Sequence, residues 1–335
     1  MGSDCAGRNS FFFGKATLTA VAMFAAVAAA PVAAGADTYP SRPVRIVVPY
    51  GAGGIADVTM RLVAQKLSDK LGQQFIIDNR PSGGGVIGVK SVVTSEPDGY
   101  TLSMIGGGLT IAKSLFKSLP YDIETDLIPI STTAFYGLVI ATKADSPLKT
   151  VQDVITAAKA KPGKLNFGSI NPGSNQHLSA ELFRLSAQIN VTMIPYKTTP
   201  ELVTALIRGD IDVVFEYQAA LQGALSDRQI VAIATTGRER SKSLPDVPTV
   251  AQSGLPDYEV TSWNGLAAPK GTPPEVVAIL NRGVNDAVAT PDVQAATAQF
   301  GMEARGSTVD DLRARIKRDV ANWADVIATG GIEKK

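Results

Sequence analysis

Residues 167–183, FGSINPGSNQHLSAELF, contain His177, the only histidine in 335 residues, just after a loop of Ser, Asn, Pro and Gly. A histidine in such a place can act as a general base, bind a metal ion or lie beside an anion site. A general base needs a nucleophile that it orients, and the nearest hydroxyl, Ser174, is better explained as a helix cap. One histidine cannot form a His-rich zinc site, and the carboxylates show no ligand spacing. We therefore expect neither catalysis nor a metal here.

The same loop has the features of an anion site. A helix is expected to start at Ser174 or Asn175, and the first turn of a helix leaves free N–H groups at the positive end of its dipole. Neutral hydroxyl and amide donors come from Ser169, Asn171, Ser174 and Asn175. GAGGIAD (51–57) is expected to form a similar helix start, and its glycines leave the backbone N–H groups accessible. Two facing helix starts would hold a small carboxylate across a cleft, unless both stretches are ordinary turns between strand and helix.

The glycine stretch also fits a nucleotide-binding pattern. GAGGIA (51–56) matches G-x-G-x-x-A, and Asp78 ends the next expected strand, where a ribose-binding acid belongs. An NAD(P)-dependent oxidoreductase is therefore the alternative from another class. Against it, Pro49 and Tyr50 separate the strand from the first glycine, and exported proteins rarely meet free NAD. We expect no cofactor.

The first residues predict export. Arg8 and Lys15 precede an apolar run over 16–30, and Ala-Gly-Ala at 34–36 has the small residues of a signal-peptide cleavage site. These are the three parts of a secretory signal peptide, so we expect cleavage after Ala36 and a periplasmic protein. The single cysteine, Cys5, leaves with the leader. Disulfides, thiolate catalysis and cysteine metal sites are then excluded.

The charge of the mature chain argues against polyanionic partners. Removing Asp4, Arg8 and Lys15 takes Lys+Arg from 32 to 30 and Asp+Glu from 31 to 30. The mature chain is formally neutral and has no basic cluster with interleaved aromatic residues. Binding to nucleic acid or to an anionic membrane is not expected.

Strand and helix patterns alternate along the chain, which predicts an α/β fold with a parallel sheet. Strands are expected at 44–48, 75–78, 101–105, 165–169, 191–196, 210–215 and 230–235, and helices at 58–71, 178–187, 276–288, 309–327 and from 199 onward. Two long extended stretches, 127–143 and 230–250, are interpreted as crossings between two domains. Domain 1 would comprise 37–137 and 236–335, domain 2 would be the inserted 138–235, and the ligand cleft would lie between them.

Several stretches in order resemble one family across essentially the whole mature chain. They are VPYGAGGIADVTMRLVAQKL, DNRPSGGGVIG, PDGYTL, LPYD, FGSINPGSNQHLSAELF, IPYKTTPELVTALIRGDIDVVF, SLPDVPTVAQSG, SWNGLAAPKGTPPEV and WADVIATGGI. Together they resemble the Bug solute receptors of tripartite tricarboxylate transporters. The resemblance implies a two-lobed periplasmic binding protein of Venus flytrap, type II-like form, without catalysis. Its ligand would be a small organic carboxylate, delivered to integral-membrane permease subunits, and a monomer is the default.

The resemblance also implies the roles of particular residues. The loop from Tyr50 to Asp57 would touch the ligand mainly through backbone and ordered water, and the loop from Ser169 to Asn175 would hold a carboxylate. His177 and Asp212 match a family histidine and a family acid near the cleft, and direct contact of either with the ligand is left open. The expected ligand-binding residues are Tyr50, Ala52, Gly53, Gly54, Asp57, Gly107, Ser169, Asn171, Ser174, Asn175, His177, Asp212 and Glu216.

Three departures from the family concern the ligand. Gly51 stands where proline is usual, GGGLTIAKSLF (106–116) lacks a common Asn-Pro, and Glu216-Tyr217-Gln218 replaces an Asp-Asn type pair. Segments 106–110 and 216–218 are therefore expected to set ligand identity. An acid at 216 argues against a tricarboxylate and favours aliphatic or aromatic mono- or dicarboxylates. An exported sensory protein with the same site is a further alternative.

Overall fold

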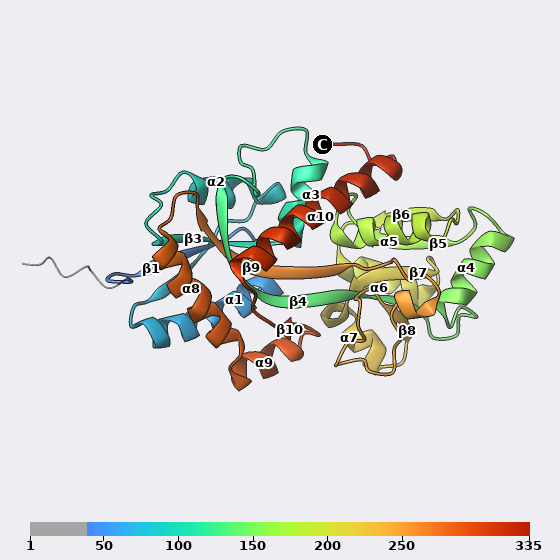
Figure 1. Ribbon diagram of the computed structural model, residues 1–335. Coiled ribbons are helices and arrows are strands. Elements are labelled where there is room, and N and C mark those ends of the chain that lie inside the picture. The colour runs from blue at the N-terminus through green and yellow to red at the C-terminus, as the bar shows by residue number, and fades with distance from the viewer. Residues whose placement is uncertain (1–38) are drawn as a thin grey trace, which may run out of the picture. The chain divides into compact units, whose positions relative to one another are not determined.

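Strand β4, Leu127–Lys143, is seventeen residues long and runs through both halves of the molecule (Figure 1). Its sequence, LIPISTTAFYGLVIATK, is rich in the β-branched and aromatic residues that suit a strand. The computed structural model describes residues 39–335, which belong to one compact unit. Within them the strands form a ten-stranded sheet with β4 near its middle. The predicted signal peptide and its cleavage site lie outside the described residues.

In the first half, the strand order is β2-β1-β3-β9-β4. β1 pairs in parallel with β2 and β3, whereas β9 is antiparallel to β3 and to residues 127–137 of β4. The short β10 is also antiparallel to β4. The elements are β1 Val44–Val48, α1 Ile55–Leu71, β2 Phe75–Asn79, η1 Gly83–Gly85, α2 Val86–Val93, β3 Thr101–Gly106, α3 Gly107–Leu115, β9 Thr261–Pro269, α8 Pro274–Val288, α9 Pro291–Ala298 and β10 Glu303–Ala304.

In the second half, the strand order continues as β4-β7-β5-β6, with β8 also paired to β4. β5 is parallel to β6 and β7, and residues 138–143 of β4 pair antiparallel with β7 and β8. The elements are α4 Val151–Ala160, β5 Asn166–Ile170, α5 Asn175–Ser186, β6 Thr192–Tyr196, α6 Thr199–Arg208, β7 Val213–Tyr217, α7 Gln218–Ser226, β8 Ile230–Thr235 and η2 Ala251–Ser253.

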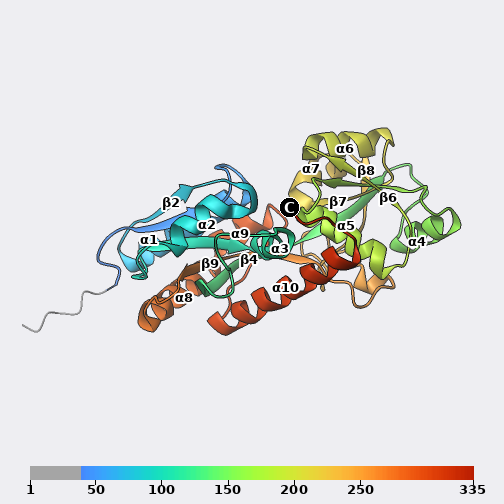
Figure 2. The ribbon, with the colours of Figure 1, turned by 90° about the horizontal axis from the view of Figure 1, so that it is seen from above.

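Each half has its own apolar core. In the first half, Ile46 and Met60 are fully buried together with Leu280 of α8. In the second half, the rings of Phe167, Phe183 and Phe215 lie with centroids 5.6–6.0 Å apart. The last helix, α10 (Val309–Thr329), packs against α3 and, further along, against α5, so it lies along both halves (Figure 2). Its apolar residues recur at helical spacing, as the sequence predicted.

The structure confirms the expected strands and helices to within a few residues. The sheet is mixed rather than only parallel, because β4, β8, β9 and β10 pair antiparallel. Val250, Tyr258 and Val260 belong to the apolar core around Phe183. The division into two domains at the predicted boundaries stays a prediction.

Candidate functional site

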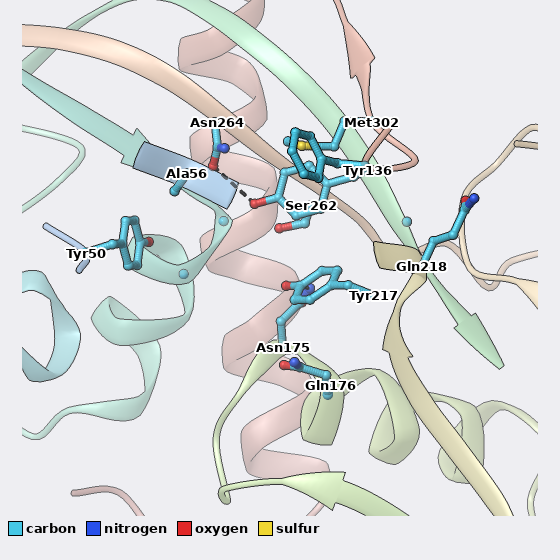
Figure 3. Close-up of a pocket in the computed structure, with 14 residues that line it drawn as sticks. Tyr50, Ala56, Tyr136, Asn175, Gln176, Tyr217, Gln218, Ser262, Asn264 and Met302 are labelled. Atoms are coloured by element: carbon cyan, nitrogen blue, oxygen red, sulfur yellow. Dashed lines mark hydrogen bonds between the residues drawn. The ribbon is translucent and has the colours of Figure 1, made fainter. Parts of the chain in front are cut away.

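A cavity of about 290 Å³ lies where parallel strands of the two halves end (Figure 3). Tyr50 and Gly107 follow β1 and β3 in the first half, whereas Asn175 follows β5 after a short loop and Tyr217 is the last residue of β7 in the second. The cavity is lined by Tyr50, Ala56, Gly107, Gly108, Tyr136, Gly137, Asn175, Gln176, Tyr217, Gln218, Ser262, Asn264, Phe300 and Met302. The carboxyl ends of parallel strands are the usual ligand sites of α/β proteins.

Four helices begin at this cavity. Its lining includes the second residue of α1, the first two residues of α3 and of α5, and the first residue of α7, namely Ala56, Gly107, Gly108, Asn175, Gln176 and Gln218. The capping residues of α1, α3 and α7 are Gly54, Gly106 and Tyr217, and none of them makes a side-chain capping hydrogen bond. Free N–H groups and the positive ends of helix dipoles therefore face one cavity, which suits an anion.

No charged side chain lines the cavity. None of its fourteen lining residues is Asp, Glu, Lys, Arg or His. An anion held here would be bound by neutral donors and helix starts rather than by an ion pair. Among residues 39–335, no group of three or more His, Cys, Asp or Glu side chains is placed to hold a metal ion.

The neighbouring strands β4 and β9 supply polar residues to the wall. Tyr136 of β4 donates a hydrogen bond of 3.1 Å to Oδ1 of Asn264 of β9. Asn264 is 2% exposed, and its Nδ2 has no hydrogen-bond partner within the described part of the chain. The ring of Tyr136 also meets that of Tyr217 edge-on, with centroids 5.4 Å apart (Figure 3). Burial raises the pKa of both tyrosines, so both hydroxyls keep their protons.

The first predicted loop reaches the cavity only at its two ends. Tyr50 lines the cavity, whereas Ala52, Gly53 and Gly54 are exposed and lie outside the lining. Asp57 is buried beneath the loop and accepts a hydrogen bond of 2.9 Å from the Gly53 N–H. Asp57 therefore fixes the backbone of the loop at Gly53.

Two further side chains hold Asp57 in place. Arg61 lies 3.0 Å from the carboxylate as an ion pair, and Asn79 Nδ2 donates a hydrogen bond of 2.9 Å. Burial alone would raise the pKa of Asp57, but the hydrogen bonds from Arg61, Gly53 and Asn79 outweigh it and lower the pKa. The charge of Asp57 is thus balanced inside the protein.

In the second predicted loop, Asn175 lines the cavity and the other residues support it. Ser174 caps α5: its Oγ accepts from the His177 N–H at 3.1 Å and donates to the Ile170 carbonyl at 2.6 Å. Asn175 Nδ2 donates to the Tyr217 hydroxyl at 3.0 Å. The remaining two expected residues lie outside the lining: Asn171 is exposed, and Ser169 is fully buried in β5.

His177 faces its own loop. Its Nδ1 accepts a hydrogen bond of 3.2 Å from the Gly173 N–H, and its Nε2 lies 3.9 Å from Glu181. Burial lowers the pKa of His177, the Glu181 carboxylate opposes this shift, and Lys335 adds to it. The neutral imidazole therefore braces the loop before α5.

The two acids expected near the ligand lie outside the lining. Asp212 precedes β7 and accepts a hydrogen bond of 2.8 Å from the Asn166 N–H, at the opposite end of the strand from Tyr217. Glu216 is 1% exposed and lies behind Gln176 and Tyr217. Gly107, from the segment expected to set ligand identity, does line the cavity.

Several lining residues were not expected from sequence. They come from strands β4 and β9 and from the connection between α9 and β10, and they are Tyr136, Ser262, Asn264, Phe300 and Met302. The one available signal was the length of the extended stretch 127–143, which was interpreted only as a crossing. Phe300 and Met302 carry no local signal, because tertiary packing alone brings them here.

A second cavity of about 350 Å³ adjoins the first and shares Tyr136, Gly137, Gln218 and Met302 with it. Its rim carries charges of both signs, including an ion pair of 3.1 Å between Lys242 and Glu303. Gln218 stands between the two cavities and accepts a hydrogen bond of 2.7 Å from Ser243. The first cavity is thus the uncharged one of the two.

Within residues 39–335, none of the helices combines the length and the apolar character needed to cross a membrane.

Comparison with known proteins gives consistent similarities along most of the chain. Residues 59–332 match the family described as "Tripartite tricarboxylate transporter family receptor". Protein BugT of Bordetella pertussis (strain Tohama I) is 35% identical over 320 residues, which are 95% of this chain and 98% of BugT. The structure of Rpa4515 of R. palustris with adipate has a TM-score of 0.74 at 31% identity and covers 88% of this chain and 99% of that one. MatC (Rpa3494) from Rhodopseudomonas palustris with bound malate has a TM-score of 0.70 at 28% identity, over 86% and 100%.

Proposed function

The chain belongs to the receptor family of tripartite tricarboxylate transporters, and from this premise we propose that it captures a small mono- or dicarboxylate and delivers it to a membrane permease. The family is one of solute-binding receptors, and the chain has their two-lobed α/β periplasmic binding protein fold. The carboxylate, the permease and the export of this chain are parts of the proposal.

One observation supports a carboxylate ligand: the starts of four helices line the cavity, and no charged side chain does. Free N–H groups at helix starts bind anions without a basic residue. The bound adipate and malate in the two similar structures, both carboxylates, support the same class of ligand. Phe300 and Met302 add apolar wall, which suits the carbon skeleton of such an acid.

Residues from both halves of the molecule line the cavity, and this suggests how a ligand is captured. We propose that the halves are two lobes that close about the crossing stretches, with β4 as one of them. A ligand that touches Tyr50 on one side and Tyr217 on the other favours the closed state by its extra affinity for that state. Ordered waters serve nearly as well as direct hydrogen bonds, so one cavity can accept related acids.

No observation favours the nucleotide-dependent oxidoreductase. Asp78, the acid that would bind a ribose, lies 2.9 Å from Arg80 and 3.3 Å from Arg45. Its carboxylate thus already has two cationic partners. The sensory alternative uses the same cavity and differs only in the partner, so growth of a deletion strain on the ligand distinguishes it from transport.

The test of the ligand class is thermal unfolding of the protein, purified from the periplasm of an expression host, against a panel of carboxylates with NADH as control. A ligand present at 100 times its dissociation constant stabilises by about 2.7 kcal/mol. For a chain of this size that is a rise in Tm of about 4 °C. Intact mass of the same sample tests cleavage after Ala36.

A rise with carboxylates that becomes smaller when Asn175 is replaced by alanine would support the proposal. A rise with NADH alone would contradict it and favour the oxidoreductase. For the permease, uptake of the identified acid must require both this protein and the membrane subunits.

A further inference from the structure

Glu216 is a buried carboxylate just behind the cavity wall. It is the fourth residue of β7 and is 1% exposed. It accepts three hydrogen bonds: 2.7 Å from the Tyr217 N–H, 3.0 Å from Gln176 Nε2 and 3.1 Å from Thr199 Oγ1. Gln176 and Tyr217 are themselves part of the cavity lining. Glu216 is therefore separated from a ligand by one layer of side chains.

The three donors to Glu216 come from the starts of three helices. Gln176 is the second residue of α5, Thr199 is the first residue of α6, and Tyr217 is the residue before α7. The positive end of a helix dipole attracts a carboxylate. In the second half of the molecule, the side chain of Glu216 is already such a carboxylate.

The charge of Glu216 is not balanced by a cation. Across residues 39–335, no Lys or Arg nitrogen is paired with Glu216, whereas the other buried acid beside the cavity, Asp57, is paired with Arg61 at 3.0 Å. Burial raises the pKa of Glu216 above its usual value, and its three hydrogen bonds offset only part of that shift. The Tyr217 N–H and the Gln176 NH₂ group can only donate, and the Thr199 hydroxyl can donate as well, so the site can satisfy an ionised carboxylate.

The first half differs, because the buried acid in the first turn of α1, Asp57, is paired with Arg61. α1 and α3 begin at the cavity behind the glycines Gly54 and Gly106, which make no side-chain capping hydrogen bond. Asn264, on the neighbouring β9, is buried with no partner for its Nδ2 among the described residues. The unmet donors are therefore at the α1–α3 end of the cavity, away from Glu216.

We propose that Glu216 acts as a built-in counter-anion that restricts the cavity to ligands with a single carboxylate. The carboxylate lies at the α1–α3 end, and a neutral group lies toward Gln176 and Tyr217. Because Gln176 gives its NH₂ group to Glu216, its amide oxygen is left to accept from a hydroxyl or amide of the ligand. This inference rests on the proposed carboxylate-binding function and narrows it from mono- or dicarboxylates to monocarboxylates.

The variant that tests this is Glu216→Gln, which removes the charge and keeps the shape. The amide oxygen can accept from Gln176 and from the Tyr217 N–H, and the NH₂ group can donate to Thr199 Oγ1. Asp227→Asn is the matched control. It removes one negative charge at the exposed far end of α7, about 13 Å along the helix from its start.

The probes are three acids with the same six-carbon chain: adipate, its monoamide and hexanoate. Binding is measured by calorimetry on the full protein. We expect the wild type to bind the monoamide or hexanoate at least about tenfold more tightly than adipate, because two like charges repel strongly in a buried site. Glu216→Gln should reduce that ratio about tenfold or more, and Asp227→Asn should leave it unchanged.

The wild-type comparison alone tests the inference if Glu216→Gln does not fold. Tighter wild-type binding of adipate than of its monoamide would overturn the inference, and would point to the charged rim of the second cavity. An unchanged ratio in a folded Glu216→Gln protein would overturn it as well. Failure of all three acids, and of the wider panel, to bind either protein would overturn the proposed function, and the inference with it.

Discussion

The hydroxyl of Tyr136 and the amide of Asn264 join strands β4 and β9 by a hydrogen bond of 3.1 Å inside the cavity wall. The bond uses the amide oxygen, so the NH₂ group of Asn264 is buried without a partner in the described structure. An unpaired buried donor costs about 1–3 kcal/mol. A ligand carboxylate that accepts from it recovers that free energy.

Asn264→Asp is expected to weaken binding of the acid identified in the panel by at least about tenfold. The new carboxylate still accepts from Tyr136, but it offers the ligand a negative charge in place of a donor. Calorimetric titration measures the loss. Asn322→Asp, on the exposed face of α10, makes the same change outside the cavity and should bind as the wild type does. Equal affinity of the two variants would show that Asn264 does not meet the ligand.

Ser174 and Asn175 are neighbours with different expected roles. Ser174→Ala removes a helix cap, so we expect a loss of about 1 kcal/mol in the free energy of unfolding, or about 2 °C in Tm, with affinity nearly unchanged. Asn175→Ala removes a lining side chain, so we expect affinity to fall about fivefold or more. Tm and dissociation constants of both variants provide the comparison. A larger loss of affinity in Ser174→Ala would instead place its hydroxyl against the ligand.

His177 is expected to make stability depend on pH near neutrality. Burial lowers its pKa below the usual 6.5, so the unfolded chain takes up the proton first as pH falls. The stabilising contribution is present above about pH 6.5 and is lost as pH falls through the folded pKa. Charged neighbours of the ring are Glu181 and Lys335, and Arg184 pairs with Glu181 at 2.8 Å.

Urea unfolding from pH 8 to pH 5 measures this loss. His177→Asn is the comparison, because its amide oxygen can accept from the Gly173 N–H and does not titrate. The wild type should lose more stability than His177→Asn between pH 7 and pH 5. Parallel curves would mean that the imidazole is not held neutral.

Gly301 lets Gln218 lie between the two cavities. Its φ is +68°, and a Cβ added there would lie 2.5 Å from Gln218 Oε1. Gly301→Ala should therefore cost about 1–2 kcal/mol for the backbone and also displace Gln218, which changes affinity. Gly72→Ala has a similar φ, +73°, with open space around the Cβ. It should lose similar stability and keep wild-type affinity. Wild-type affinity in Gly301→Ala would place Gln218 outside the contacts with the ligand.

Sequence reasoning located the parts of the site that local patterns encode. Helix starts follow strands with recognisable capping and glycine residues, so the starts of α1 and α5 were predicted and both reach the cavity. Asn175 was expected as a ligand-binding residue and lines the cavity. The start of α7 was indicated only through the unusual residues at 216–218.

The rest of the site depends on long-range pairing. Asn264 reaches the cavity because β9 lies between β3 and β4, and nothing in its own neighbours encodes that order. Asp212 was carried over from a motif, but the five residues of β7 separate it from the cavity by about 16 Å. Glu216 faces inward because strand residues alternate between faces, and a one-residue error in register reverses that assignment.

The exchange of partners along β4 occurs next to the cavity. Gly137 is the last residue of the strand to pair with β9, and Leu138 is the first to pair with β7. Leu138 is held there by hydrogen bonds with Thr236, of 2.8 Å and 3.0 Å. Tyr136, whose ring forms part of the wall, is one residue away. In the proposed lobe closure, a ligand that contacts Tyr136 therefore binds directly beside the residues about which the lobes would rotate, and no chain of intervening residues separates binding from that movement.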